Sequence, residues 1–508
     1  MSARPIKRTV VAIILIFLIG WFLYADTLRV PFIFDDKPNI TENPCIRMTA
    51  VTPDQIANII NSPAPRPFAN FTFAINYYFH QYHVTGYHLI NILIHIITAV
   101  LIFFITNATL RLCRKASVSP TTPAALFAAI IWLIHPLHTQ SVTYIVQRMN
   151  SLAAMFSLFG LLCYIKARLA FKAPGQKIKK SLLVTGVIVA GALGLASKEN
   201  AAILPATLLL YEWFFLQDLR PDWIKKQAWW LVVVGVSILA AAIIYMGASP
   251  MAFLLNMYET QPFTMPQRLL TEPLVILYYL SLLFYPHPAR LTLDYPFPIS
   301  ESLWMPAITI LGLTALFLMM IGAIVTARKY RLVSFAIFWF LMTLIIESSF
   351  IGLALIFEHR TYLPSVFPVI AVVILLTNCL KSRPPTAVCL FTSIIILLLT
   401  WTYQRNSVWQ NEKVFWNDCL AKNPHSARLY NNLGIVLLQH NQPERAIRRF
   451  KEAITIDLAY YKAYNNIGIT LYQQHHPAQA IAWYQRALAI HPSFAEAANN
   501  LGTALLSL

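Results

Sequence analysis

Long apolar runs separated by short polar segments dominate the first four hundred residues. An α-helix needs roughly 20 apolar residues to cross a bilayer, and many of these runs approach that length. We expect spans in residues 9–25, 88–110, 122–134, 143–164, 181–197, 200–216, 228–246, 302–326, 332–346, 363–380 and 386–402. The pattern predicts an all-α, polytopic membrane bundle of about eleven spans. We expect the first helix to be a membrane span and not a cleaved signal peptide, because no small-x-small cleavage site follows Tyr24.

The distribution of charge gives this bundle an orientation. The 508 residues are 57% hydrophobic and 12% charged, with a net charge of +18. Basic clusters flank the apolar runs at Arg4/Lys7/Arg8, Arg111/Arg114/Lys115, Lys166 to Lys180, Arg220/Lys225/Lys226, Arg328/Lys329/Arg331 and Lys381/Arg383. Cytoplasmic loops carry such an excess, so the charge reports topology and gives no reason to expect nucleic acid as a partner. We expect a multi-pass protein of the cell inner membrane with a cytoplasmic amino terminus.

With the basic clusters inside, the outer side receives the first loop (26–87), the turns at 135–142, 197–200 and 358–360, and the chain beyond about residue 403. The loop 26–87 contains NYYFHQYH, whose aromatic and histidine residues are typical of helices at the membrane interface. The run 268–285 would break the alternation of sides if it crossed. We therefore predict a re-entrant or interfacial helix within an outer excursion over 247–300.

The tail is polar and periodic. Asn-Leu/Ile-Gly recurs at Asn432, Asn466 and Asn500, a spacing of 34 residues that Pro443 and Pro477 repeat. Small residues where paired helices touch and a helix-opening proline are typical of tetratricopeptide repeats, which stack into an α-solenoid. We predict a membrane domain over 1–403 and a repeat domain over 404–508 on the periplasmic side. A helix at about 407–421 and another from Ser493 would cap two full repeats.

Six cysteines are scattered without CxxC spacing, so the sequence indicates neither a metal site nor a disulfide framework. Cys45 and Cys419 both fall on the predicted outer side. Nothing in the sequence pairs them.

Ionisable residues gather at the predicted outer mouth of the bundle. They are Asp35, Asp36, His135, His138, Arg148, Lys198, Glu199, Glu358, His359 and Arg360. Charged groups at a membrane domain are costly and mark functional sites by default. Each also has a structural alternative: a solvated helix end for the acid pair, a hydrogen-bonded turn for the HxxH histidines, an interfacial anchor for Arg148, and a neutralising pair for Lys198 and Glu199. The hypothesis of a site depends on their occurring together.

A lipid-anchored phosphosugar would need this combination of acids and bases. A carboxylate takes the proton of an acceptor hydroxyl, and fixed cations stabilise the departing lipid phosphate. Ion or solute transport would instead favour charges near the midplane and inverted repeats, and neither is evident.

Several motifs occur in a specific order: FDD after the first span, RPFANFTFAINYYF, GYHLINILIH, HPLHTQSVTYIVQRMNSLAAMFSLFGLLCY, SKENAAILPATLLLYE, FEHRTYLPS, and RNSVW before the repeats. In this order they resemble the transmembrane and tetratricopeptide repeat-containing protein O-mannosyltransferases. The resemblance covers nearly the whole chain. The small number of repeats indicates a bacterial member.

The resemblance implies a C-type membrane glycosyltransferase (GT-C) fold, a polyprenyl-phosphate-linked sugar donor, and inverting transfer to a protein Ser or Thr on the outer face. It makes Asp35 the base and Asp36 its orienting neighbour or a ligand of a divalent cation. It assigns Arg148, Lys198 and Arg360 to the donor phosphate. Between Glu358 and His359 it leaves open which takes the role of the family's glutamate.

An extended acceptor polypeptide would lie in the repeat groove around Asn432, Asn466 and Asn500. Other functions remain open on the sequence alone: a glycan or lipid acceptor, a lipid-pyrophosphate oligosaccharide donor, or a non-catalytic membrane-anchored repeat scaffold. The sequence names no certain cofactor.

Overall fold

The computed structural model describes residues 3–62, 65–113, 121–171, 177–247, 249–259 and 261–508. Arg114 and Lys115 of one basic cluster, and residues 172–176 of another, lie outside this description. The described residues form helices, turns and loops without a strand, which confirms the all-α prediction. They divide into two compact units, Met1–Leu291 with Pro298–Ser407, and Thr292–Phe297 with Val408–Leu508. Each unit is described by itself.

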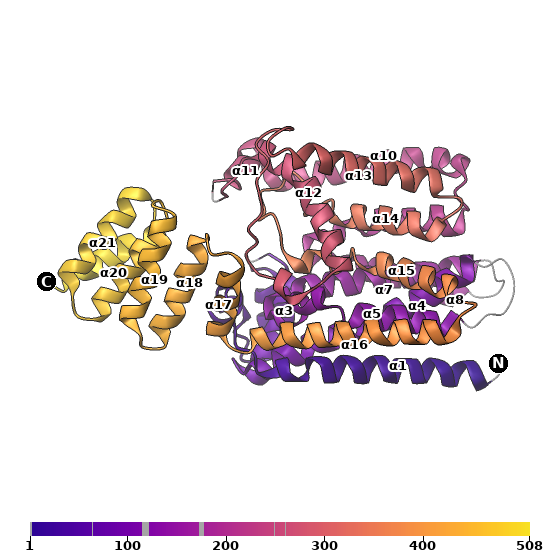
Figure 1. Cartoon of the computed structure of the whole chain (residues 1–508), viewed down its shortest axis with the longest axis horizontal. Coiled ribbons are helices and arrows are strands. Elements are labelled where there is room, and N and C mark those ends of the chain that lie inside the picture. Colours follow the sequence, from indigo (N-terminus) through magenta and orange to yellow (C-terminus); the bar gives the residue numbers. More distant parts are fainter. Residues whose placement is uncertain (1–2, 63–64, 114–120, 172–176, 248, 260) are drawn as a thin grey trace. The chain divides into compact units, whose positions relative to one another are not determined.

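Long helices lying side by side build the first unit (Figure 1). They are α1 (Ala3–Tyr24), α4 (Val84–Cys113), α5 (Thr121–Leu133), α7 (Arg148–Phe171), α8 (Lys177–Leu195), α10 (Pro221–Met246), α12 (Met265–Phe284), α13 (Ile308–Thr326), α14 (Arg331–Leu344), α15 (Val366–Cys379) and α16 (Pro384–Trp409). Helix α4 is central, since it packs against α1, α5 and α7. Helix α5 also contacts α15, and α14 lies between α13 and α15.

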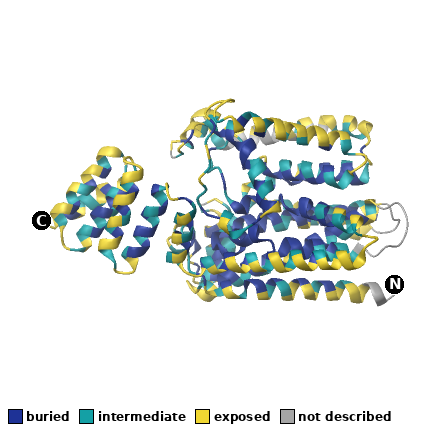
Figure 2. Cartoon of the chain, in the orientation of Figure 1, coloured by how far each residue is buried: buried dark blue, intermediate teal, exposed yellow. Residues whose placement is uncertain are grey.

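Among the described helices, six are long and apolar enough to cross a membrane: Ile6–Arg29, Val84–Cys113, Ile145–Phe171, Lys177–Leu195, Ile308–Thr326 and Pro384–Trp409. A seventh candidate is bent by 52° between Thr122–Leu133 and Pro136–Thr143. Large apolar side chains such as Phe317 and Val325 of α13 are exposed, as lipid-facing residues would be (Figure 2). The chain is a multi-pass membrane protein, and the count of eleven spans stays a prediction.

Two predicted spans differ from the structure. The segment 200–216 is not one helix but the 3-10 helix η6 (Glu199–Ile203), the α-helix α9 (Leu204–Tyr211) and the π-helix η7 (Glu212–Leu216). Pro205 lies in the first turn of α9, where its missing N–H and fixed φ suit the start of a new helix. The helix predicted from residue 302 begins only at Ile308, after Pro306.

The long first loop contains two further α-helices, α2 (Pro53–Ile60) and α3 (Pro67–His80), so the helices expected in that loop are present. The run 268–285 forms the helix α12, which packs against α13. Whether α12 is re-entrant or interfacial stays a prediction.

The second unit is a stack of antiparallel helix pairs: α17 (Glu412–Lys422), α18 (Ala427–Gln439), α19 (Pro443–Ile456), α20 (Tyr461–Gln473), α21 (Pro477–Ile490) and α22 (Ala495–Leu506). A Cβ at Gly434 would lie 2.4 Å from the Phe450 ring, and one at Gly468 would lie 2.5 Å from the Tyr484 ring. Only glycine allows each large ring to pack against the facing helix. The repeat architecture predicted from the 34-residue period is confirmed.

Candidate functional site

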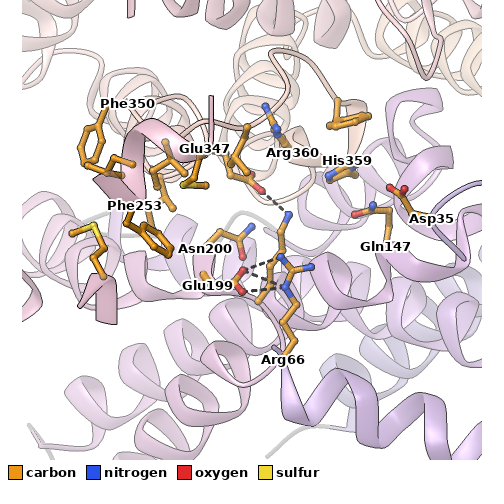
Figure 3. Close-up of a pocket in the computed structure, with 18 of the residues that line it drawn as sticks. Asp35, Arg66, Gln147, Glu199, Asn200, Phe253, Glu347, Phe350, His359 and Arg360 are labelled. Carbon is orange, nitrogen blue, oxygen red and sulfur yellow. Dashed lines mark hydrogen bonds and ion pairs between the residues drawn. The ribbon is translucent and has the colours of Figure 1, made fainter. Parts of the chain in front are cut away.

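A cavity of about 680 Å³ opens in the first unit (Figure 3). Its polar lining is Asp35, Arg66, Tyr144, Gln147, Lys198, Glu199, Asn200, Glu347, His359 and Arg360. Its apolar lining is Met246, Phe253, Leu254, Met257, Ile346, Phe350, Ile351, Leu353 and Phe357. Segments far apart in the sequence therefore build one chamber with a charged part and an apolar part.

A tight turn brings Asp35 to this cavity. The preceding residue, Phe34, has a φ of 50°, a left-handed conformation that is rare for a bulky side chain. The Asp36 carboxyl group secures the turn, since its oxygens accept hydrogen bonds from the backbone N–H of Ile33 at 2.9 Å and of Val146 at 2.7 Å. Strained backbone of this kind persists only where the surroundings over-determine it. Asp36 therefore holds the conformation that presents Asp35.

Asp36 itself is 1% exposed and does not line the cavity. Burial raises its pKa to about 8, against the lowering effect of the two backbone N–H groups. Because both of its oxygens already accept from the backbone, its surroundings do not fit a metal ligand. No group of three or more His, Cys, Asp or Glu side chains among the described residues is placed to hold a metal ion.

The half-buried Asp35 is anchored through its own backbone. Its N–H donates to the Tyr144 hydroxyl at 2.8 Å, and its C=O accepts from the Asn39 side-chain amide at 2.8 Å. Tyr144 also lines the cavity, beside Gln147. The backbone that carries the Asp35 carboxylate is thus fixed at the wall of the chamber, and a proton-accepting group requires a defined position.

Two cation–carboxylate pairs belong to the polar lining, and their labelled members lie between Asp35 and Phe253 in this view (Figure 3). Arg66 forms a forked pair with Glu199, in which Nε lies 3.1 Å from Oε1 and Nη2 lies 3.1 Å from Oε2. The Lys198 ammonium donates to Glu347 at 2.5 Å and to the Asn150 side-chain oxygen at 3.0 Å. Burial lowers the pKa of Lys198, and the Glu347 charge opposes that shift.

Arg360 is the third cation of the lining, and it is bound differently. Its Nη1 donates to the backbone carbonyls of Ala354 at 2.7 Å and Leu355 at 3.0 Å. Its guanidinium carbon lies 5.4 Å from the centre of the Phe357 ring. Backbone carbonyls fix the guanidinium without neutralising its charge, so Arg360 is well placed to meet an anion.

His359 lies beside Arg360 and is nearly buried, at 6% exposure. Its ring stacks on Phe357 with 5.1 Å between centroids, and its backbone C=O accepts from the Asn150 amide at 2.7 Å. Glu358 points elsewhere: its carboxylate lies 3.6 Å from Arg405 of α16, and both side chains are fully buried. Of these two neighbours it is therefore His359 that lines the cavity.

Arg148, expected at the donor phosphate, lies in the protein interior. Its Nε donates to Asn91 Oδ1 at 2.7 Å, its Nη2 to the Tyr87 carbonyl at 2.8 Å, and its Nη1 to the Thr72 carbonyl at 3.2 Å. The guanidinium also stacks over Phe73 at 4.6 Å. The side chain is 0% exposed and outside the cavity lining, so its geometry is that of a brace between α3, α4 and α7.

The HxxH histidines are also outside the lining. His135 Nε2 lies 3.0 Å from the Leu283 carbonyl, and its Nδ1 accepts from the Leu137 N–H, which leaves neither nitrogen for a metal. His138 packs against Trp132, with 4.5 Å between ring centroids. Their contacts match the hydrogen-bonded turn that was the structural alternative.

Helix α12 supports the cavity from outside. Arg268 donates to four backbone carbonyls of one loop, those of Glu347 at 2.7 Å, Ser349 at 2.8 Å, Ala354 at 3.4 Å and Leu353. The same guanidinium pairs with Glu272 one turn along α12 at 2.7 Å. The loop held in this way supplies Glu347 and much of the apolar lining.

In the repeat unit, the asparagines expected in an acceptor groove form a ladder. The Asn466 amide donates to Asn431 Oδ1 at 2.8 Å, and the Asn500 amide donates to Asn465 Oδ1 at 3.1 Å. Each rung joins the first helices of successive repeats. Asn466 and Asn500 thus fix the stacking of the repeats, and Asn432 occupies the corresponding position in α18.

Two charged residues of the lining were not among the sequence candidates. Arg66 lies in the RPFANF motif and Glu347 follows the apolar run of α14. Glu347 carried a usable signal, because a lone acid after a long apolar run needs a partner. Arg66 carried a weaker signal, since its partner Glu199 lies 133 residues away in the chain.

Comparison with known proteins gives this geometry a context. Models of the tetratricopeptide repeat match residues 415–448 and 461–494. A protein O-mannosyl-transferase of Caenorhabditis elegans is 26% identical over 86% of this chain and 61% of its own length. Protein O-mannosyl-transferase Tmtc3 of Drosophila melanogaster is 24% identical over 77% of this chain and 48% of its own. Protein O-mannosyl-transferase TMTC4 of Mus musculus is 24% identical over 83% and 63%.

The chain therefore spans about half to under two thirds of the length of these relatives. A bacterial origin stays a prediction. Over most of its own length the chain is homologous to proteins named protein O-mannosyl-transferase, and the resemblance inferred from its motifs is confirmed.

Proposed function

We propose that the chain is an integral-membrane glycosyltransferase that moves a sugar from a polyprenyl phosphate to a Ser or Thr hydroxyl on the periplasmic or luminal face. One observation carries the proposal: a single cavity joins the Asp35 carboxylate, the cations Lys198 and Arg360, and an apolar wall. A lipid phosphosugar has three matching parts, namely an acceptor-facing sugar, a phosphate and an apolar chain. The names of the relatives favour mannose as the sugar and a protein as the acceptor.

The proposed reaction is a direct displacement at the anomeric carbon. The acceptor oxygen attacks that carbon while Asp35 takes the hydroxyl proton. The bond between the anomeric carbon and the phosphate oxygen breaks, and polyprenyl phosphate leaves with the electron pair. Arg360 and Lys198 stabilise the charge that develops on that phosphate. A single displacement inverts the anomeric centre, and no step passes through a metal at Asp36.

The apolar wall supports the lipid part of the donor. Phe253 and Phe350 lie on the side of the cavity away from Asp35 (Figure 3), and Met257 and Leu353 also belong to the apolar lining. Burying a prenyl chain there would contribute about 25 cal/mol for each Å² removed from water. The repeats would present an extended acceptor polypeptide, as α-solenoids do.

The test is transfer by the purified full chain in lipid nanodiscs, with polyprenyl-phosphate mannose as donor and Ser/Thr-containing peptides of exported proteins as acceptors. We expect Asp35→Asn to lower kcat by about 10²–10⁴-fold with little change in the donor KM. Asp54→Asn is the matched control, because Asp54 lies in the same outer loop on an exposed face of α2.

Equal activities of the wild type and Asp35→Asn would remove Asp35 as the base. Absence of both donor binding and turnover in the wild type would favour the membrane-anchored scaffold. Transfer to a glycan or lipid, but to no peptide, would replace the protein acceptor in this proposal. The roles proposed for Asp35, Lys198 and Arg360 would be unaffected.

A further inference from the structure

A second recess lies in the repeat unit and has no part in the proposed reaction. It has a volume of about 370 Å³ and is bounded by three helices, α17, α18 and α19. Leu433 and Leu437 of α18 form its floor, and both are buried. Its walls are Lys413, Asn417, Arg445, Arg448, Arg449 and Glu452.

The walls are strongly basic. Four cations face one carboxylate, Glu452, which is already engaged with Arg449 Nη1 at 2.7 Å. The recess therefore keeps an excess of positive charge in a concave space, where charges of one sign reinforce each other's potential. Concentrating like charges costs free energy in the empty protein, and an anion relieves that cost.

Packing of the repeats does not require these cations. One repeat later, 34 residues on, the positions of Arg445, Arg448 and Arg449 hold Gln479, Ala482 and Trp483. The two repeats even make the same type of contact at this position. The guanidinium carbon of Arg449 lies 5.9 Å from the centre of the Tyr430 ring, and the ring centres of Trp483 and Tyr464 are also 5.9 Å apart. The same scaffold thus folds with neutral residues at all three places, so the charge of the first repeat calls for another explanation.

The recess also follows directly on a membrane span. Helix α16 is a candidate span that ends at Trp409, and Lys413 comes four residues later. Four residues reach at most about 14 Å, and the headgroup region is about 5–8 Å deep on each side of a bilayer, so Lys413 lies within reach of the membrane surface. Arginine forks and lysine point charges are the side chains that bind phosphate groups.

We propose that this recess binds the phosphate of an anionic lipid headgroup and so tethers the first repeat to the membrane surface. The phosphate would lie between Lys413 and the arginines of α19, above the apolar floor. The ligand chemistry is a phosphate ester, which a phospholipid or a free phosphate could supply. The short chain distance between the end of α16 and Lys413 favours the lipid.

The test uses the full chain, purified in neutral detergent, and titrates it with phosphatidylglycerol and with phosphatidylcholine while native mass spectrometry counts bound lipids. The variant Arg445→Gln/Arg448→Ala/Arg449→Trp places the residues of the second repeat into the first, so it is expected to fold. The control Lys451→Gln/Lys462→Gln/Arg486→Gln removes the same charge from exposed positions outside the recess.

We expect phosphatidylglycerol to bind the wild type in preference to phosphatidylcholine, and the recess variant to bind it about tenfold or more weakly. The control should stay within about twofold of the wild type, because screened surface charges contribute little. Equal losses in the two variants would show unspecific attraction and overturn the proposal. Displacement of the lipid by micromolar inorganic phosphate, or by an acidic peptide, would overturn the lipid assignment. None of these outcomes depends on glycosyl transfer.

Discussion

The side-chain carbonyl of Gln140 accepts two hydrogen bonds from His359, from its backbone N–H at 2.8 Å and from its ring Nδ1 at 3.0 Å. A backbone N–H can only donate, so this atom of Gln140 must be the oxygen and Nδ1 must carry a proton. Burial and the charges of Lys198 and Arg360 lower the pKa of His359 well below its ordinary value, so the ring is neutral. Its Nε2 is therefore an acceptor at the cavity.

Two substitutions distinguish the roles of the two ring nitrogens of His359. His359→Gln places an oxygen acceptor near the position of Nε2, whereas His359→Asn keeps a donor toward Gln140 and loses that acceptor. We expect His359→Asn to lower kcat/KM by about 2- to 13-fold, which corresponds to one neutral hydrogen bond, and His359→Gln to retain most of the wild-type kcat/KM. Steady-state kinetics with the same donor and acceptor measure both. The reverse order would mean that the contact with Gln140, not the cavity acceptor, sets the rate.

Asp36 predicts a pH dependence of stability. Its folded pKa of about 8 lies above the ordinary value of 3.8, so the folded state keeps a proton that the unfolded state releases. The free energy of unfolding should therefore fall as pH rises from about 4 to about 8, by up to about 1.4 kcal/mol per unit. Thermal unfolding in detergent across this range tests it.

Asp36→Asn should flatten that slope, because asparagine does not titrate. Its side-chain N–H would also point at a backbone N–H donor, which should lower the free energy of unfolding by about 1–3 kcal/mol. It should also lower kcat, because the turn at Phe34 then loses its support. Asp35→Asn is the comparison: it removes one charge that raises the pKa of Asp36, so the slope should persist but end at a lower pH than in the wild type. Identical slopes in the wild type and Asp36→Asn would contradict the prediction.

Arg148→Lys tests the brace. Lysine keeps the charge but cannot reproduce the donors that reach Asn91, Tyr87 and Thr72. We expect the free energy of unfolding to fall by about 2–4 kcal/mol, while the donor KM stays within about twofold. A raised donor KM with unchanged stability would return Arg148 to the phosphate site.

Substitutions of Lys198 and of Glu347 should change the donor KM in opposite directions. Lys198→Met removes a cation and should raise the donor KM by about 10-fold or more. Glu347→Gln frees the ammonium of its 2.5 Å partner and should lower the donor KM. It should also lower the pKa of Lys198 further, because the Glu347 charge now holds that pKa up.

The activity of Glu347→Gln should consequently decline at a lower alkaline pH than that of the wild type. Donor titrations at several pH values measure both effects. A change of the same sign in the two variants would show that the pair acts only through stability.

The strongest patterns in the sequence predicted the fold best. The run predicted at 122–134 is α5 at Thr121–Leu133, and the 34-residue period gave α18 to α22. Apolar length and exact repetition are local properties, so they survive without knowledge of the packing. The segment 200–216 was wrong as one helix, because apolar composition hid the break that Pro205 permits.

The site was predictable where residues lie in turns at one end of the bundle. Asp35, Lys198, Glu199, His359 and Arg360 all line one cavity, although their chemical roles stay predictions. Arg148 does not reach the cavity. Its place in the first turn of α7 does not reveal which face of the helix points inward, so the sequence could not predict that this side chain is buried elsewhere. Long-range partners such as Glu347 depend on how α14 packs, which no local pattern contains.

The clamp of Arg268 has a consequence for how the cavity can change. Arg268 holds the 347–354 loop by hydrogen bonds to backbone carbonyls, and every residue type provides such a carbonyl. The side chains of Phe350, Ile351 and Leu353 are therefore free to vary without loosening the grip. Selection can reshape the apolar wall for prenyl chains of other lengths or saturation, while the loop keeps its course.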